Sequence, residues 1–164
     1  MSRSQSPAER LGDLLQEFVN RVSHLQGNTR AVLTEESVTL QQVLLLRRLT
    51  QLGECSPSEL ANAMRMSLPA VSQMIDRLFV IGLLTRAEAP DDRRRKRVAV
   101  TGKGEALLAR IRRARAAEYT AGTSRLSPAV RAELIGVLGK ALRELPREAV
   151  AIAAESAGAN ARRA

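Results

Sequence analysis

The spacing of apolar residues along the chain predicts a mainly helical protein. Between residues 8 and 27 apolar side chains recur every three or four positions, which is typical of an amphipathic helix that Gly27 would end. The next stretch, residues 28–38, contains Asn28, Thr34 and Ser37. It reads as a connector that can include a short turn.

A capping box marks the start of the second predicted helix. Thr39 is followed three residues later by Gln42, and in such a pair each side chain satisfies a backbone N–H of the other residue. The sequence VLLLRRLTQL that follows is apolar on most faces, so we expect it to be deeply buried. Gly53 is placed to end this helix.

A second capping box opens a short third helix. Ser56 would be the N-cap, Pro57 the first helical residue and Glu59 the acid of the box. Cys55 and Leu60 then occupy the two positions of a hydrophobic staple, in which an apolar residue before the cap packs on one in the first turn.

A tight turn at residues 64–66 leads into a fourth helix, so the two helices form a helix-turn-helix. Ser67 is the expected N-cap, and the helix should run to Ile81 with Gly82 as its C-cap. Its inward positions are apolar, namely Val71, Met74, Ile75 and Leu78.

A β-hairpin is predicted directly after the helix-turn-helix. Residues 83–86 can form one strand, and residues 97–101 alternate as a second. Asp91 and Asp92 are turn formers, so the Arg-rich run beside them should form the tip. We therefore expect a mainly α fold with a small β-hairpin, a winged helix-turn-helix.

Two further helices should follow the hairpin. The first covers roughly residues 103–121, with Leu107, Leu108, Ile111 and Tyr119 near one face. Ser127-Pro128 starts the second, which carries an apolar stripe up to Leu145 before Pro146 interrupts it.

Composition narrows the classes of protein and of site. The 164 residues suit one domain, and an apolar content of 45 % argues against a disordered chain. One Cys and one His exclude an internal disulfide and a Cys₄ or Cys₂His₂ zinc site. With no Trp and one Tyr, a row of base-stacking aromatics is not expected. No apolar run approaches the roughly 18 residues of a membrane span, and the first residues resemble no secretory signal. We expect a soluble, cytoplasmic protein without cofactors.

The excess positive charge is concentrated in one stretch. The whole chain carries a net charge of +9, and residues 86–115, with eleven basic and four acidic residues, carry +7 of it. Such a patch attracts polyanions, although an arbitrary Arg run is by default a solvated loop. Its position beside a helix-turn-helix favours DNA, because the second helix can enter the major groove and the basic hairpin can reach the neighbouring backbone or minor groove.

Three sequence pieces between Thr39 and Gly104 resemble the MarR (multiple antibiotic resistance regulator) family of transcriptional regulators. The first is Thr39…Gln42…Leu46…Leu49, and the second is AVSQMIDRLFVIGLL in the recognition helix. The third is the wing signature Asp-x-Arg-x-x-x-(Val/Ile)-x-(Leu/Val)-Thr-x-x-Gly. It is present as Asp92-Arg93-Arg94-Arg95-Lys96-Arg97-Val98-Ala99-Val100-Thr101-Gly102-Lys103-Gly104.

The resemblance implies a homodimer that binds a pseudo-palindromic double-stranded DNA and acts as a repressor. Residues 1–38 would supply an N-terminal dimerisation helix and connector, residues 39–101 the DNA-binding core, and residues 102–164 the C-terminal dimerisation helices and tail, all in one compact protomer. It also implies that a small effector, often an anionic aromatic compound, can bind between the dimerisation and DNA-binding parts and weaken DNA binding.

The wing supplies the first group of candidate DNA contacts. Arg94 matches the wing-tip Arg of the signature and is the best candidate for a phosphate or minor-groove contact. Asp92 more plausibly orients that Arg than meets DNA. The remaining wing cations exceed what the signature needs, and alternation along a strand would turn about half of them away from the duplex; the candidates among them are Arg93, Arg95 and Lys96.

The recognition helix supplies the second group. Ser72, Gln73 and Arg77 lie outside its apolar stripe, so base or phosphate contacts are favoured over plain solvation. Ser67 is a cap first and a phosphate donor second, and Asp76 should pair or orient within the helix. The full set of candidates on this helix is Ser67, Pro69, Ala70, Ser72, Gln73 and Arg77.

Several other residues have both a purely structural and a functional interpretation. Cys55 could be an oxidation sensor, because thiols near helix N-termini have a lowered pKa, but the staple is favoured. His24 is expected to be an ordinary His rather than a ligand. The basic residues of the long helix form a solvated face by default, with DNA-flank or acidic-ligand contacts as alternatives; they are Arg110, Arg112, Arg113 and Arg115.

Other functions explain the sequence less well. A basic RNA-binding or ribosome-associated protein without catalytic activity would keep the charged patch, but the deep, narrow major groove of RNA does not admit a recognition helix. An enzyme is not supported, since the chain has no phosphate loop or paired-carboxylate motif and its one His and one Cys are far apart. Membrane-surface binding would need a basic amphipathic helix with aromatics, which is missing.

Overall fold

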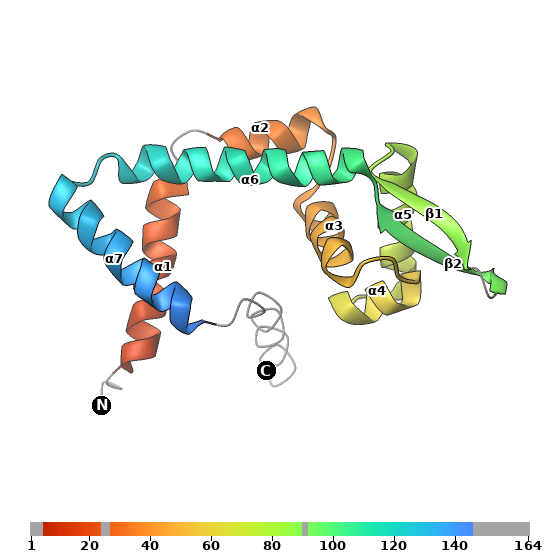
Figure 1. Cartoon of the computed structure of the whole chain (residues 1–164), viewed down its shortest axis with the longest axis horizontal. Coiled ribbons are helices and arrows are strands. Elements are labelled where there is room, and N and C mark those ends of the chain that lie inside the picture. The colour runs from red at the N-terminus through yellow and green to blue at the C-terminus, as the bar shows by residue number, and fades with distance from the viewer. Residues whose placement is uncertain (1–4, 24–26, 90–91, 146–164) are drawn as a thin grey trace. The chain divides into compact units, whose positions relative to one another are not determined.

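The computed structural model describes residues 5–23, 27–89 and 92–145, which form seven helices and a two-stranded antiparallel sheet (Figure 1). In chain order these are α1 (Pro7–Ser23), α2 (Asn28–Glu35), α3 (Leu40–Leu52), α4 (Pro57–Met64), α5 (Leu68–Val80), β1 (Leu84–Ala89), β2 (Asp92–Val100), α6 (Gly102–Thr123) and α7 (Pro128–Glu144). The predicted fold class is confirmed. The chain divides into two compact units at residue 122, so α7 belongs to a different unit from the elements before it.

The apolar core of the first unit lies between α3, α4, α5, the hairpin and the first turns of α6. Each large side chain buried there contributes about 1.5–3 kcal/mol relative to exposure. The burial expected for α3 is confirmed for most of its apolar residues, whereas Leu44 and Leu52 are exposed. The fully buried large side chains are Leu45, Leu46, Leu49, Leu60, Ile75, Leu78, Leu83, Leu84, Val43, Val71 and Val98.

The predicted helix caps are present at three helix starts. Thr39 Oγ1 accepts from the backbone N–H of Gln42 at 3.2 Å, and Gln42 Oε1 accepts from that of Thr39 at 2.8 Å. Ser56 and Glu59 form the same reciprocal pair at the start of α4, at 3.2 and 2.7 Å. Ser127 caps α7 through its hydroxyl.

The connector predicted over residues 28–38 is wrong, because α2 occupies most of it. A helix of eight residues is marginal by itself, and α2 is held by α6, which runs alongside it (Figure 1). Glu118 of α6 accepts from the backbone N–H of Thr29 at 2.7 Å, and Arg110 of α6 forms ion pairs with Glu35 and Glu36. These partners are distant in sequence, so local pattern gave no sign of them.

The hairpin is longer than predicted, and its Arg-rich run belongs to β2 rather than to the tip alone. Pairing is regular from Leu84 opposite Val100 as far as Glu88 opposite Lys96. The register then shifts, and residues 93–95 fall in the irregular part. The expectation that half of the wing cations point away assumes unbroken pairing, and it therefore does not apply to these three residues.

No helix in the described ranges is both long enough and apolar enough to cross a bilayer.

Candidate nucleic-acid interface

A sharp turn sets the angle between α4 and α5. Arg65 has a left-handed backbone with φ of 53°, and its N–H donates to carbonyls of the last turn of α4. Ser67 then occupies the N-cap position of α5, but its side chain makes no capping hydrogen bond. The prediction that Ser67 is the N-cap residue is confirmed, and the prediction that its side chain caps the helix is wrong. The exposed Ser67 hydroxyl is therefore not used to cap α5.

The two faces of α5 differ in burial. Val71, Ile75 and Leu78 are fully buried and attach the helix to the core. A helix repeats every 3.6 residues, so the residues between these buried positions lie on the opposite face, where their side chains project away from the core. Of the predicted contacts, Pro69, Gln73 and Arg77 are exposed on that face, while Ala70 and Ser72 are half-buried at its margins.

An ion pair joins the recognition helix to the wing. Arg86 of β1 bonds to the carboxylate of Asp76 on α5, and its guanidinium carbon lies 5.0 Å from the centre of the Phe79 ring. The expectation that Asp76 pairs within its own helix is therefore wrong. This contact also places a cation beside a carboxylate that would otherwise repel a nearby phosphate.

A hollow of about 200 Å³ lies between α5 and the hairpin. Its polar lining consists of Ser72, Asp76, Arg86 and Lys96, and its apolar lining of Pro57, Ile75 and Val98. The half-buried Ser72 and the exposed Lys96 were predicted as contacts on separate elements. The structure brings them to one place.

The base of the wing is fixed to the loop between α3 and α4. Arg97 Nε donates to Glu54 Oε1 at 3.1 Å, and the backbones of Cys55 and Val98 exchange hydrogen bonds of 3.2 and 2.8 Å. Burial raises the pKa of the Cys55 thiol, the charge of Glu59 raises that pKa further, and Arg97 opposes both. A buried thiol with a raised pKa is a poor redox sensor, so the structure favours the hydrophobic staple over the oxidation sensor for Cys55.

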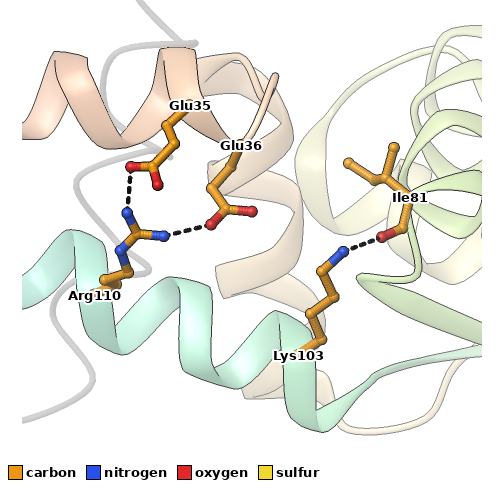
Figure 2. Close-up of polar contacts among 5 residues, drawn as sticks. All are labelled: Glu35, Glu36, Ile81, Lys103 and Arg110. Atoms are coloured by element: carbon orange, nitrogen blue, oxygen red, sulfur yellow. Dashed lines mark hydrogen bonds and ion pairs between the residues drawn. The ribbon is translucent and has the colours of Figure 1, made fainter.

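The Thr-x-x-Gly end of the wing signature has a structural explanation. Thr101 Oγ1 donates to the Gly82 carbonyl at 2.8 Å and accepts from Gly104 N–H at 3.1 Å. A Cβ on Gly104 would stand 2.3 Å from the carbonyl oxygen of Leu83, so only glycine allows this approach. Lys103 Nζ donates to the Ile81 carbonyl at 2.8 Å (Figure 2). These contacts fix the start of α6 on the end of the recognition helix, and the motif's spacing alone did not reveal that.

The basic residues of α6 divide into two kinds. The solvated interpretation is wrong for Arg110, which bonds both Glu35 and Glu36 (Figure 2). Arg112 and Arg113 are exposed and Arg115 is half-buried, and none of the three has an ion pair among the described side chains, so for them the solvated face stays a prediction.

Some predicted roles fall outside what the structure describes. This applies to the side chains of residues 92–95, hence to Asp92 and to Arg93, Arg94 and Arg95, and to the whole of His24 and Pro146. Their assignments stay predictions. Within the described ranges, no group of three His, Cys, Asp or Glu side chains could hold a metal ion.

Comparison with known proteins agrees with this geometry. The sequence model that describes the MarR family matches residues 38–96 of this chain. A putative transcriptional regulatory protein for the hcr operon of Thauera aromatica is 33 % identical over 115 residues, which cover 70 % of this chain and 69 % of that protein.

Solved structures show the same fold. A transcriptional regulator from Thermotoga maritima aligns with a TM-score of 0.68 at 25 % identity, over 80 % of this chain and 90 % of the other. A MepR mutant from S. aureus, bound to an oligodeoxyribonucleotide, aligns with a TM-score of 0.61 at 19 % identity, over 87 % and 100 % of the two chains. The helix-turn-helix, the wing and these likenesses together show that the chain belongs to the MarR family, whose members are DNA-binding transcriptional regulators and not enzymes.

Proposed function

We propose that the protein is a homodimeric repressor that binds a pseudo-palindromic DNA duplex and releases it when a small anionic or aromatic effector binds. The observation that carries the proposal is the outward face of α5 beside a basic hairpin, with the apolar face of the same helix fixed in the core. A rigid helix with a free polar face suits the major groove.

In the proposed complex α5 reads bases and the wing contacts the backbone. Gln73 and Arg77 have the amide and guanidinium groups that pair with adenine and guanine edges, each worth about 1–3 kcal/mol of discrimination. Arg94 and Lys96 of the wing would meet phosphates or the minor groove. The oligodeoxyribonucleotide bound to the MepR mutant supports docking of DNA on this fold.

Exposed apolar side chains support the homodimer. The stripe on α1 leaves Leu11, Leu14, Leu15 and Val19 exposed, and α7 has no buried residue in its own unit. Contiguous exposed apolar side chains mark interaction surfaces, and a second copy of the chain offers the same stripes for a symmetric interface. The exposed apolar residues of α7 and its end are Val130, Ile135, Val137, Leu138, Leu142 and Leu145.

Side chains on one face of α3 support the proposal that the effector is an anionic aromatic compound. Arg48 Nε is buried and has no hydrogen-bond partner, while Nη1 donates to Gln51 at 3.3 Å. Exposed Leu40 and Leu44 precede Arg48 on the same helix face. A carboxylate could bind the guanidinium and an aromatic ring could cover the leucines, so Arg48→Gln should abolish the thermal stabilisation that an aromatic acid gives the wild type.

The proposal is tested by enrichment of random duplexes on the purified protein. We expect a two-fold symmetric consensus, a sedimentation mass of two chains per duplex, and little competition from an RNA duplex of the same sequence. A single asymmetric site, or equal binding of RNA, would contradict the proposal. In transcription from a promoter carrying the selected site, added protein should lower the yield; a higher yield would refute repression.

A further inference from the structure

One face of α6 carries a row of polar contacts to other helices. Lys103 donates to the Ile81 carbonyl at the end of α5, as described above. Two helical turns later, about 10 Å along the axis, Arg110 bonds Glu36 through Nη1 and Glu35 through Nη2 (Figure 2). The same helix therefore holds the recognition helix at one point and the end of α2 at another.

The distal half of α6 is attached to α1 and to the start of α2. Buried Glu118 accepts from the backbone N–H of Thr29 at 2.7 Å. Gly122 lies against α1 so closely that a Cβ on it would be 2.6 Å from the Cα of Val22. Because α1 carries the exposed apolar stripe, the contacts along α6 run from the proposed dimer surface to the recognition helix.

Two connections lead from this distal region to the winged helix. One is the chain through α2 into α3, and the other is α6 itself. The Arg110 guanidinium is a planar fork, and bonding two neighbouring carboxylates restricts both sliding and rotation of α2 against α6. With the fork in place, the two connections move as one.

We propose that Arg110 is a positioning residue that sets the separation between the two recognition helices, and so the half-site spacing that the protein accepts. The inference rests on the proposed homodimer. Arg110 acts within the protein, since its guanidinium is engaged by Glu35 and Glu36. When the fork is lost, α2 keeps the packing of Val32 and Leu33 on the core and the hydrogen bond to Glu118, but α6 and the attached α5 gain freedom to shift.

The test uses the full chain and the duplex selected by enrichment, with the distance between half-sites lengthened or shortened by one base pair. Wild-type protein should discriminate against the altered spacings. Arg110→Gln should reduce that discrimination by about two- to thirty-fold and leave the salt dependence of binding unchanged. Arg110→Lys, which keeps the charge without the fork, should lie between the two.

Arg113→Gln is the matched control, because it removes the same charge from an exposed position on the same helix. It should keep the wild-type spacing preference. An unchanged preference in Arg110→Gln would overturn the inference while leaving the proposed function intact. A wild type that binds single half-sites as tightly as paired ones would overturn the homodimer, and this inference with it.

Spin labels give a second readout that needs no DNA. Labels on Asn62→Cys, an exposed position on α4, report the distance between the two DNA-binding cores. The buried Cys55 should remain unlabelled. The distance distribution should broaden in Arg110→Gln and keep its wild-type width in Arg113→Gln; equal widths in all three proteins would overturn the inference.

Discussion

Replacing Gly104 by alanine should destabilise the protein, although alanine is the better helix former. Gly104 lies in the first turn of α6, and a Cβ there would come 2.3 Å from the Leu83 carbonyl oxygen and 2.6 Å from Cγ1 of Val100. The valine methyl can turn away, but the carbonyl belongs to the backbone and can move only with the chain. The added atom therefore forces the start of α6 away from the backbone at Leu83, just before β1.

Two opposing terms set the expected magnitude. Adding a methyl group to a packed site costs about 1–3 kcal/mol, and exchanging glycine for alanine within a helix gains about 0.5–1 kcal/mol. The clash is with backbone, so the cost should lie in the upper part of its range. We expect a net loss of about 1–2 kcal/mol in the free energy of unfolding, or a fall in Tm of about 2–8 °C.

Urea unfolding followed by circular dichroism measures this loss, with Gly102→Ala as the control. Gly102 lies in the same turn, and a Cβ on it would meet nothing within 4 Å. The control should be neutral or slightly stabilised, so the two variants should change stability in opposite directions or nearly so. If Gly104→Ala were as stable as Gly102→Ala, the close approach would not be what requires glycine here.

The remaining predictions concern the interface and the thiol. Gln73→Ala should change which duplexes are preferred, whereas Arg94→Ala should weaken the binding of all of them. In the proposed homodimer Arg94→Ala removes one contact from each protomer, so the slope of log K against log salt should fall in magnitude by about two. Titrations of several duplexes at several salt concentrations measure both effects, and a uniform loss for Gln73→Ala would place that side chain on the DNA backbone. A double-mutant cycle with Asp76→Asn and Arg86→Gln should give a coupling of about 0.2–1 kcal/mol in urea unfolding, since the carboxylate is exposed; purely additive effects would show that the pair contributes nothing. The native Cys55 thiol should react with a thiol reagent far more slowly than the unfolded one, because its pKa is raised by burial. Because the pKa of the thiol is higher in the folded than in the unfolded protein, its contribution to the free energy of unfolding is complete below the unfolded pKa of about 8.5 and is lost as pH rises through the folded pKa. Cys55→Ala should therefore lose less stability than wild type between about pH 8 and pH 10, and equal losses would contradict the raised pKa of Cys55.

The parts of the fold that follow from neighbouring residues were predictable from the sequence. A capping box needs only a hydroxyl and an acid or amide three residues apart, and both pairs, Thr39 with Gln42 and Ser56 with Glu59, are present. The inward stripe of the recognition helix is likewise a matter of helical period. Such features depend on contacts within one turn, which the folded protein preserves.

The predictions that were wrong concern features that depend on partners brought together by the fold. The helix at residues 28–35 is held by Glu118 and Arg110, far along the chain. Asp76 has an adjacent Arg in its own helix, yet it bonds Arg86 because the hairpin folds back beside α5. Ser67 has a capping side chain at the right position and still makes no capping bond. Residue type and spacing indicate what a side chain can do, and tertiary neighbours decide what it does.

The basic stretch from Arg86 to Arg115 illustrates this distinction for DNA binding. Among its cations with described side chains, Arg86, Arg97, Lys103 and Arg110 have partners within the protein. They fix the wing and α6 in place, so the whole +7 can speed the approach of DNA at long range without every cation meeting a phosphate. The salt dependence of binding counts only the phosphates neutralised, at about 0.9 per contact. A dimer using all eleven cations of each protomer would give a slope of about −20, and we expect a markedly shallower one; a slope near −20 would show that these intramolecular partners are exchanged for DNA.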